Sequence, residues 1–519
     1  MRTKLSIQEQ QLLTAAEQGD LPEVMRLIAE KVNFNISDAN EKSPLYIAAE
    51  NGHTGVVEYL ITQNAYLNKE TNYNATPLYI AAEKGHTKVV ELLLNARAEF
   101  DKSKIYRDSP IFKAAENGHK EIVRLLLNVK AKFNDSNSYS GTPIFAAAKN
   151  GHKEIVKMLI DEKADLNKQT MNGITPIIAA VEKGNTEIVD LLIKAGADLN
   201  KPTNNGETPT FIAAKNGQND ILDLLLAKNA NPNIATYEPY SYRDSEGVYI
   251  ETPIFVAAQN GHHETVEKLI NAKAHFDVTT DKGKTPLYIA AENGHTKVVD
   301  QLIKAGANIN IKEKYDETTP IFKAAQNGHI EVVKQLIAAK ADVNTKNKDG
   351  ETPLSLSLRE NHIDITKDLL LAGANPTECE NNFETSNFIQ ALKSINIESL
   401  SSTELSNIEQ NGCYALAKLA QLESKNEEEK TTFDQEKKDL FMKILSFDDQ
   451  IKFEFLKSPE LLEIIKSTDL TPIQKINIFH NAAQNPDREN IVGEKPQSSP
   501  SGNITGGLLD KPSRGCTIS

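Results

Sequence analysis

The sequence predicts an all-α solenoid of short repeats, followed by a small helical domain and a disordered tail. Two observations predict the solenoid. A Thr-Pro or Ser-Pro pair opens the same phrase ten times, and seven of the nine intervals between these prolines are 33 residues long. A fixed period of this length indicates identical units that are each too small to bury their own apolar face, so neighbouring units supply the core. The prolines are Pro44, Pro77, Pro110, Pro143, Pro176, Pro209, Pro253, Pro286, Pro320 and Pro353.

Each unit is expected to contain two helices, as the copy at residues 285–307 illustrates. Thr285 suits an N-cap, and Pro286 suits the first helical position because no N–H is needed there. The first helix should end near Gly294, and the second should follow at once and end at a left-handed Gly306. The apolar residues of the second helix recur at helical spacing, at Val298, Val299, Leu302 and Ile303.

The phrase from Thr285 to His295, Thr-Pro-Leu-Tyr-Ile-Ala-Ala-Glu-Asn-Gly-His, resembles the signature of the ankyrin repeat, whose unit is a β-turn plus two antiparallel helices. A degenerate first copy at residues 12–19 lacks the Thr-Pro pair and suits an N-terminal cap. The copy at residues 352–358 lacks the Ala pair and suits a terminal repeat. Eleven ankyrin repeats are therefore expected over about residues 5–378.

Two residue types recur at fixed places in these repeats. The fourth position of the phrase is aromatic where ankyrin repeats usually have His, and we expect these rings to pack as a core spine, with ligand stacking as the alternative. They are Tyr46, Tyr79, Phe112, Phe145, Phe211, Phe255, Tyr288 and Phe322. Histidine recurs between the two helices, where one copy per repeat predicts structural hydrogen bonds and argues against a metal site. These are His53, His86, His119, His152, His262, His295, His329 and His362.

The resemblance implies that the turns between repeats project as fingers and, with the first helices, line a concave surface that binds partners. Eleven residues are inserted between Pro209 and Pro253. The finger that carries this insertion contains four tyrosines, Tyr237, Tyr240, Tyr242 and Tyr249. Tyrosine is favoured at interfaces, so we expect partner contact on this finger. The alternative is a tolerated loop without a role.

The concave positions lean acidic, which favours a partner with a basic segment, although such charges also serve solubility. The acidic residues are Glu50, Glu83, Glu116, Glu182, Glu207 and Glu292, against Lys149, Lys215 and Arg359. The whole chain has a net charge of -14, which argues against nucleic acid and anionic membranes as general partners. A protein partner and a monomeric chain without cofactors are expected.

The three cysteines, Cys379, Cys413 and Cys516, exclude a disulfide framework and suit a reducing cytoplasm. Residues 382–485 are interpreted as a small helical domain in which we find no catalytic motif. Cys413 is interpreted as a core residue rather than a nucleophile. The alternatives for this domain are an enzyme that modifies a recruited partner, or self-association.

Residues 486–519 are rich in Ser, Gly, Pro and Asn, which predicts a flexible tail. The last four residues, Cys-Thr-Ile-Ser, match the C-a-a-X pattern, and the final Ser favours farnesylation of Cys516. One lipid gives only weak membrane attachment, so a partner at the membrane is expected to supply the second signal.

The leading hypothesis from the sequence is therefore a non-enzymatic ankyrin adaptor that is tethered to the cytosolic face of a membrane. The long ankyrin array, the helical domain and the C-a-a-X end together loosely resemble effectors that intracellular bacteria inject into host cells. The alternative is that the same architecture belongs to a eukaryotic scaffold protein.

Overall fold

In the computed structural model, each repeat consists of two short antiparallel helices, as the sequence predicts. The structure describes residues 5–101, 109–135, 141–237 and 251–375, together with parts of 390–410. All regular elements of these described residues are helical, so the all-α prediction is confirmed. The chain divides into two units, Met1–Ala391 and Leu392–Ser519. In the second unit the structure describes α24 (Ser402–Gln410).

The first helices of the repeats, here called inner helices, pack against one another along the stack. They are α1 (Ile7–Gln18), α3 (Pro44–Glu50), α5 (Pro77–Lys84), α7 (Pro110–Glu116), α9 (Pro143–Asn150), α11 (Pro176–Glu182), α13 (Pro209–Lys215), α15 (Pro253–Gln259), α17 (Pro286–Glu292), α19 (Pro320–Gln326) and α21 (Pro353–Arg359).

The second helices, here called outer helices, form a parallel row behind them. They are α2 (Leu21–Ala29), α4 (Thr54–Thr62), α6 (Thr87–Asn95), α8 (Lys120–Asn128), α10 (Lys153–Asp161), α12 (Thr186–Lys194), α14 (Asn219–Leu226), α16 (His263–Asn271), α18 (Thr296–Lys304), α20 (Ile330–Ala338) and α22 (Ile363–Leu371).

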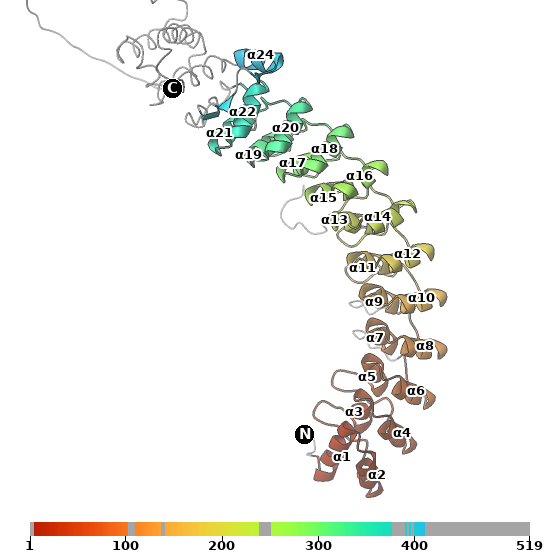
Figure 1. Ribbon diagram of the computed structural model, residues 1–519. Coiled ribbons are helices and arrows are strands. Elements are labelled where there is room, and N and C mark those ends of the chain that lie inside the picture. Colours follow the sequence, from red (N-terminus) through yellow and green to blue (C-terminus); the bar gives the residue numbers. More distant parts are fainter. Residues whose placement is uncertain are drawn as a thin grey trace, which may run out of the picture. The chain divides into compact units, whose positions relative to one another are not determined.

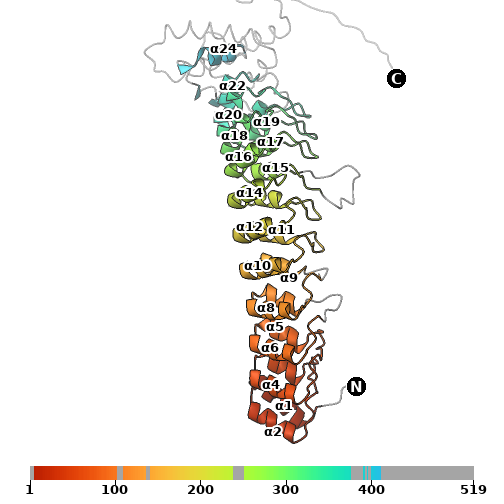
Figure 2. The same ribbon diagram turned by 90° about the vertical axis from the view of Figure 1, so that its right-hand side faces the viewer.

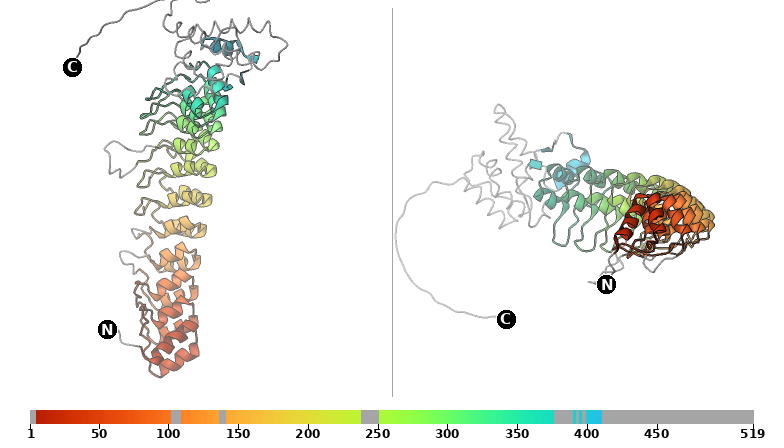
Figure 3. Two further views of the ribbon diagram at one scale, coloured as in Figure 1. Left: turned by 90° about the vertical axis from the view of Figure 1, so that its left-hand side faces the viewer. Right: turned by 90° about the horizontal axis from the view of Figure 1, so that it is seen from below.

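The repeat array is curved, with the inner helices on its concave side and the outer helices on its convex side (Figure 1). The segments that join each outer helix to the next inner helix project from one side of the stack (Figures 2 and 3). We call these segments the fingers. Side chains on the fingers and on the exposed faces of the inner helices therefore share one surface.

The inner helices of the Ser-Pro and Thr-Pro repeats begin where the sequence predicts, and all of them except α19 have a side-chain cap in the first turn. In α17, the hydroxyl of Thr285 accepts the backbone N–H of Tyr288 at 3.1 Å, and Pro286 fills the first helical position. The left-handed glycine predicted at the end of this repeat is also present, since Gly306 has φ of 90°. In α19 the capping hydroxyl is used differently, because Thr319 bonds Thr345 across the stack at 3.2 Å.

The aromatic residues at the fourth position form part of the core, as expected. Seven of the eight are buried, and Tyr79 is half-buried. The hydroxyl of Tyr288 is also satisfied, since it lies 2.7 Å from the hydroxyl of Thr318. The small Ala pairs beside these rings are fully buried, which lets successive inner helices approach closely.

The recurring histidines tie each repeat to the one before it. In all eight, the ring Nε2–H donates to a backbone carbonyl of the preceding repeat, at 2.8 to 3.2 Å. The acceptor lies at the C-terminal end of an inner helix, where carbonyls lack helical partners. For example, His86 donates to Glu50 and His119 donates to Glu83. The structural role predicted for these histidines is confirmed, and we call this contact the histidine interlock.

Each histidine ring also lies against a glycine of the preceding repeat. Gly118 has φ of 81°, and a Cβ added there would lie 2.7 Å from the His152 ring. This distance is shorter than van der Waals contact, so the position requires glycine for its backbone and for the space it leaves. The Gly-His pair is thus one packing unit shared between neighbouring repeats.

A second set of hydrogen bonds links the bases of the fingers. An Asn or Asp oxygen of one repeat accepts a backbone N–H about one repeat later, at 2.8 to 3.1 Å. The acceptors are Asn35, Asn68, Asp101, Asn134, Asn167, Asn200, Asn233, Asp277, Asn310 and Asn344. The fingers are therefore anchored at their bases.

One position on the outer helices changes character along the stack. It is apolar in six successive repeats, at Tyr59, Leu92, Leu125, Met158, Leu191 and Leu224, and polar in the last four, at Lys268, Gln301, Gln335 and Asp368. Among the described residues, Gln301 Oε1, Gln335 Oε1 and Asp368 Oδ2 are buried without a hydrogen-bond partner. Unpartnered buried oxygens destabilise a fold. We infer that the outer helices pack less favourably in the C-terminal repeats.

Replacing Gln335 by leucine should stabilise the array, because leucine occupies the equivalent place in earlier repeats and removes a buried unpartnered oxygen. We expect the free energy of unfolding to rise by about 1 kcal/mol or more, measured by urea denaturation. Lys334→Leu is the matched control at the exposed neighbouring position and should give no such gain. Equal stability of Gln335→Leu and wild type would contradict the inference.

The histidine interlock predicts that Gly118→Ala and Gly184→Ala differ in cost. Both place alanine at a positive φ, which costs about 1–2 kcal/mol. Only Gly118→Ala also collides with an imidazole ring, which should add about 1 kcal/mol or more. Thermal and urea unfolding measure both variants, and adding His152→Gln to Gly118→Ala should remove the excess. Identical losses for the two glycines would show that the ring does not restrict this position.

Candidate protein-binding surface

Ion pairs run along the exposed faces of several inner helices. The residue before the Ser/Thr-Pro pair contacts the residue eight positions later, with Lys42 to Glu50 and Lys284 to Glu292 both at 2.7 Å. Two other repeats reverse the charges, with Glu207 to Lys215 at 3.0 Å and an ion pair between Glu351 and Arg359. Pairs this exposed contribute about 0–1 kcal/mol each to stability. Their main effect is to neutralise the charges at these positions of the concave surface.

The six glutamates expected on the concave surface therefore differ in what they present, and Glu207 is paired with Lys215 as described. Glu50 and Glu292 are paired as described, and Glu116 is paired with Lys113 at 2.7 Å. Within the part of the chain that the structure describes, no ion pair reaches Glu83 or Glu182. The latter two carboxylates are the ones best able to meet a basic group of a partner.

Two carboxylates of the central repeats, Glu182 and Glu251, have raised pKa values. Only Glu182 of these two is evident from the sequence as a concave residue. Burial raises the pKa of Glu182 above its ordinary value, and the neighbouring Glu207 raises it further, while Lys149 opposes both effects. Burial likewise raises the pKa of Glu251, against the opposing charge of Lys215 and with smaller contributions from Asp281 and Glu207. Glu251 precedes its Thr-Pro pair, but the residue eight positions later is Gln259, so the usual ion pair cannot form.

The fingers carry most of the large apolar side chains that are exposed in the described residues. Six of eight such side chains lie on fingers: Tyr66, Tyr73, Met171, Tyr237, Val278 and Tyr315. Tyr237, from the predicted set, is 43% exposed and donates its backbone N–H to Asn205 of the preceding finger at 3.0 Å. The sequence reasoning missed Tyr73 and Tyr315, although an aromatic residue four or five positions before the proline was a visible signal.

Several predicted features lie outside the described residues. These are Tyr240, Tyr242 and Tyr249 of the inserted finger, Cys516 with the whole tail, and most of residues 382–485, on which the enzymatic alternative depends. Among the residues that are described, no cluster of His, Cys, Asp and Glu has an arrangement able to hold a metal ion. Within the same residues, no helix combines the length and apolarity needed to cross a membrane.

The comparisons with known proteins agree with this geometry. The sequence matches the family described as Ankyrin repeats (3 copies) over residues 12–104, 97–170, 162–236, 240–313 and 302–378. These segments make up well over half of the 519-residue chain, so the protein belongs to the ankyrin-repeat family. Ankyrin repeats imply a protein-binding adaptor.

One similar solved structure is the crystal structure of the human ASB11 ankyrin repeat domain. It shares 28% sequence identity with this chain at a TM-score of 0.38, and the alignment covers 43% of this chain and 98% of that chain. No curated protein sequence matches this chain significantly.

The raised pKa of Glu251 predicts a pH-dependent effect of its neutral analogue. A carboxyl group whose pKa is higher in the folded chain than in the unfolded chain is destabilising when ionised. Glu251→Gln should therefore be more stable than wild type at pH 7. The difference should shrink as the pH falls to about 4, because the carboxyl is then mostly protonated in both states. Urea unfolding between pH 4 and pH 8 measures it, and a variant that is less stable at pH 7 would refute the assignment.

Proposed function

We propose that the protein is an adaptor that holds a protein partner along its concave surface, through the fingers and the exposed faces of the inner helices. One observation carries this proposal: exposed large apolar side chains concentrate on the fingers, whereas the outer helices from α4 onward expose none among the described residues. Four of the six side chains on the fingers are tyrosines, and tyrosine is enriched at binding hot spots, so their concentration on one side of the array suits an interaction surface.

The charges refine the expected partner. The ion pairs along the inner helices leave the paired positions close to neutral, and the carboxylates of Glu83, Glu182 and Glu251 remain for contact. A partner that presents apolar side chains to the fingers and a few basic side chains to the central repeats fits this pattern. Such a partner differs from the highly basic ligand that the net charge alone would favour.

Photo-crosslinking tests where the partner binds. A benzophenone amino acid placed at Tyr73 or Tyr315, on the fingers, should form crosslinked complexes when the chain is expressed in eukaryotic cells. The same group at Glu58 or Lys334, which are exposed on outer helices α4 and α20, is the matched control. The proposal expects the same adduct from both finger positions and little from the controls. Adducts confined to the outer-helix positions would place the binding surface on the convex side.

We propose in addition that the adaptor is tethered weakly to the cytosolic face of a membrane by farnesylation of Cys516, and that it acts as an injected effector in a host cell. The C-a-a-X sequence and the composition of the tail support this proposal. A monomer that carries one lipid requires a second contact for stable attachment, which the bound partner would supply.

A tagged chain and its Cys516→Ser variant, expressed in eukaryotic cells, test the tether. Intact-mass measurement should show the farnesyl increment in the wild type only, and fractionation should show a membrane pool that the variant loses. An unmodified wild-type chain would leave the protein as an untethered adaptor.

A further inference from the structure

Two consecutive junctions between repeats lack the histidine of the interlock. Asn185 and Gln218 stand in its place, and their side-chain amides donate to the carbonyls of Ala148 at 3.0 Å and Val181 at 2.8 Å. The histidines of the other eight junctions use the carbonyl one place later in the repeat. Both amides therefore keep a bond to the preceding repeat, but at a shifted acceptor.

The second of these junctions lies between the helix pair α11 and α12 and the helix pair α13 and α14, and we call it the central junction. Within the described residues, α11 and α13 make less contact than any other two successive inner helices. The first junction without a histidine, between α9 and α11, is the most closely packed of the series. Loss of the histidine alone therefore does not loosen a junction, and the central junction has further causes.

One cause is a polar residue in the core of α13. Thr210 follows the proline at the place where the other nine Ser-Pro and Thr-Pro repeats have Leu or Ile. It is fully buried, and its hydroxyl has no hydrogen-bond partner among the described residues. Gln218 Oε1 is buried and unpartnered in the same helix pair. Buried oxygens without partners destabilise the packing around them.

A second cause is repulsion across the central junction. Glu182 is the last residue of α11, and Glu207 lies just before α13. Burial raises the pKa of Glu182, and the charge of Glu207 raises it further, while nearby lysines oppose both effects. Two carboxylates that repel each other across a junction weaken the contact between its helices.

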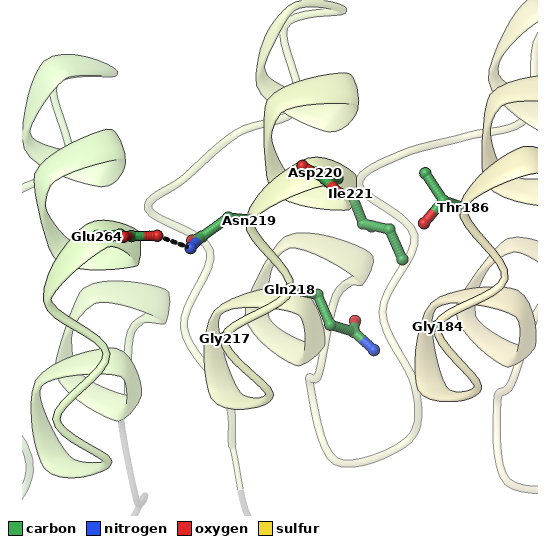
Figure 4. Close-up of a pocket in the computed structure, with 8 residues that line it drawn as sticks. All are labelled: Gly184, Thr186, Gly217, Gln218, Asn219, Asp220, Ile221 and Glu264. Carbon is green, nitrogen blue, oxygen red and sulfur yellow. Dashed lines mark hydrogen bonds between the residues drawn. The ribbon is translucent and has the colours of Figure 1, made fainter.

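Solvent also enters the central junction, because an open pocket of about 430 Å³ lies between the N-terminal ends of α12 and α14 (Figure 4). Gln218 points toward Gly184 at this place. The next junction regains the interlock, since His262 bonds the carbonyl of Lys215 at 3.1 Å. The unfavourable features are thus concentrated at one place in the middle of the array.

We propose that the central junction is a hinge, at which the array bends and opens while the repeats on either side stay stacked. Each repeat of a solenoid depends on its nearest neighbours, so one weak junction divides the array into segments that fluctuate separately. These segments are the repeats from α1 to α12 and the repeats from α13 to α22. The hinge lets the fingers of the two segments adjust independently to a partner. This use rests on the proposed adaptor function, whereas the opening itself does not.

Distances between spin labels test the hinge directly. Glu58 on α4, Lys157 on α10 and Glu267 on α16 are exposed, occupy the fifth place of their helices and lie three repeats apart. Cysteines introduced there carry the labels, in the full chain with its own three cysteines replaced by serine. The pair at Lys157 and Glu267 spans the central junction, and the pair at Glu58 and Lys157 is the matched control. We expect a broader distance distribution for the spanning pair.

Two substitutions repair the junction. Thr210→Val keeps the side-chain shape and removes the buried hydroxyl, and Gln218→His restores the ring beside Gly184. Together they should narrow the distribution of the spanning pair. They should also slow hydrogen exchange in α11 to α14 about tenfold or more, the effect of removing one unpartnered buried group. Thr210→Val alone should change both measurements in the same direction. Gln335→Leu removes a buried oxygen elsewhere and should change neither at this junction.

Equal distributions for the spanning and control pairs would overturn the proposal. A spanning pair that keeps its width in both repaired variants would overturn it as well, and so would equal narrowing by Gln335→Leu. Crosslinking of a partner to the fingers depends on none of these results, so failure of the hinge and failure of the adaptor function are distinguishable.

Discussion

The hydrogen bond from a histidine Nε2–H to a carbonyl of the preceding repeat is the contact on which this structure depends. A short inner helix ends with carbonyls that have no helical partner, and the next repeat supplies the donor. The same ring occupies the space beside a left-handed glycine, so the sequence pair Gly-His encodes a contact between two repeats. Each repeat is therefore incomplete alone, in the way expected of a solenoid whose stability resides in nearest-neighbour interfaces.

The contacts that hold the stack are separate from the fingers, and this explains where the repeats differ in sequence. The inner helices, the interlock and the Asn or Asp contacts at the finger bases hold the stack, which leaves the fingers free to carry exposed tyrosines and an eleven-residue insertion. Partial burial raises the pKa of the Glu251 carboxyl, so we expect this residue to lower stability at neutral pH. Natural proteins retain such residues at sites of function, which fits a role in partner contact.

Much of this fold could be predicted from the sequence, because every repeat places the same residues in the same environment. The proline period, the Thr285-type caps, the buried aromatic spine and the structural role of the histidines all follow from local patterns repeated many times. The ion pairs eight residues apart could not be predicted, since they depend on how a side chain crosses from the finger base to the end of the inner helix. The replacement of the histidine by Gln218 is visible in the sequence, but the hydrogen bond that Gln218 keeps to the carbonyl of Val181 depends on three-dimensional packing. Cys516, the tail and the role of residues 382–485 remain predictions.

Hydrogen–deuterium exchange of the full chain, compared between wild type and His119→Ala, tests the interlock most directly. His119 lies between α7 and α8, and its ring bonds the carbonyl of Glu83 at 3.0 Å, in the preceding repeat. The account predicts that the variant loses protection in its own repeat and also in α5, whose C-terminal end has lost its donor. Loss of protection confined to α7 and α8, with α5 unchanged, would contradict the claim that each repeat completes the one before it.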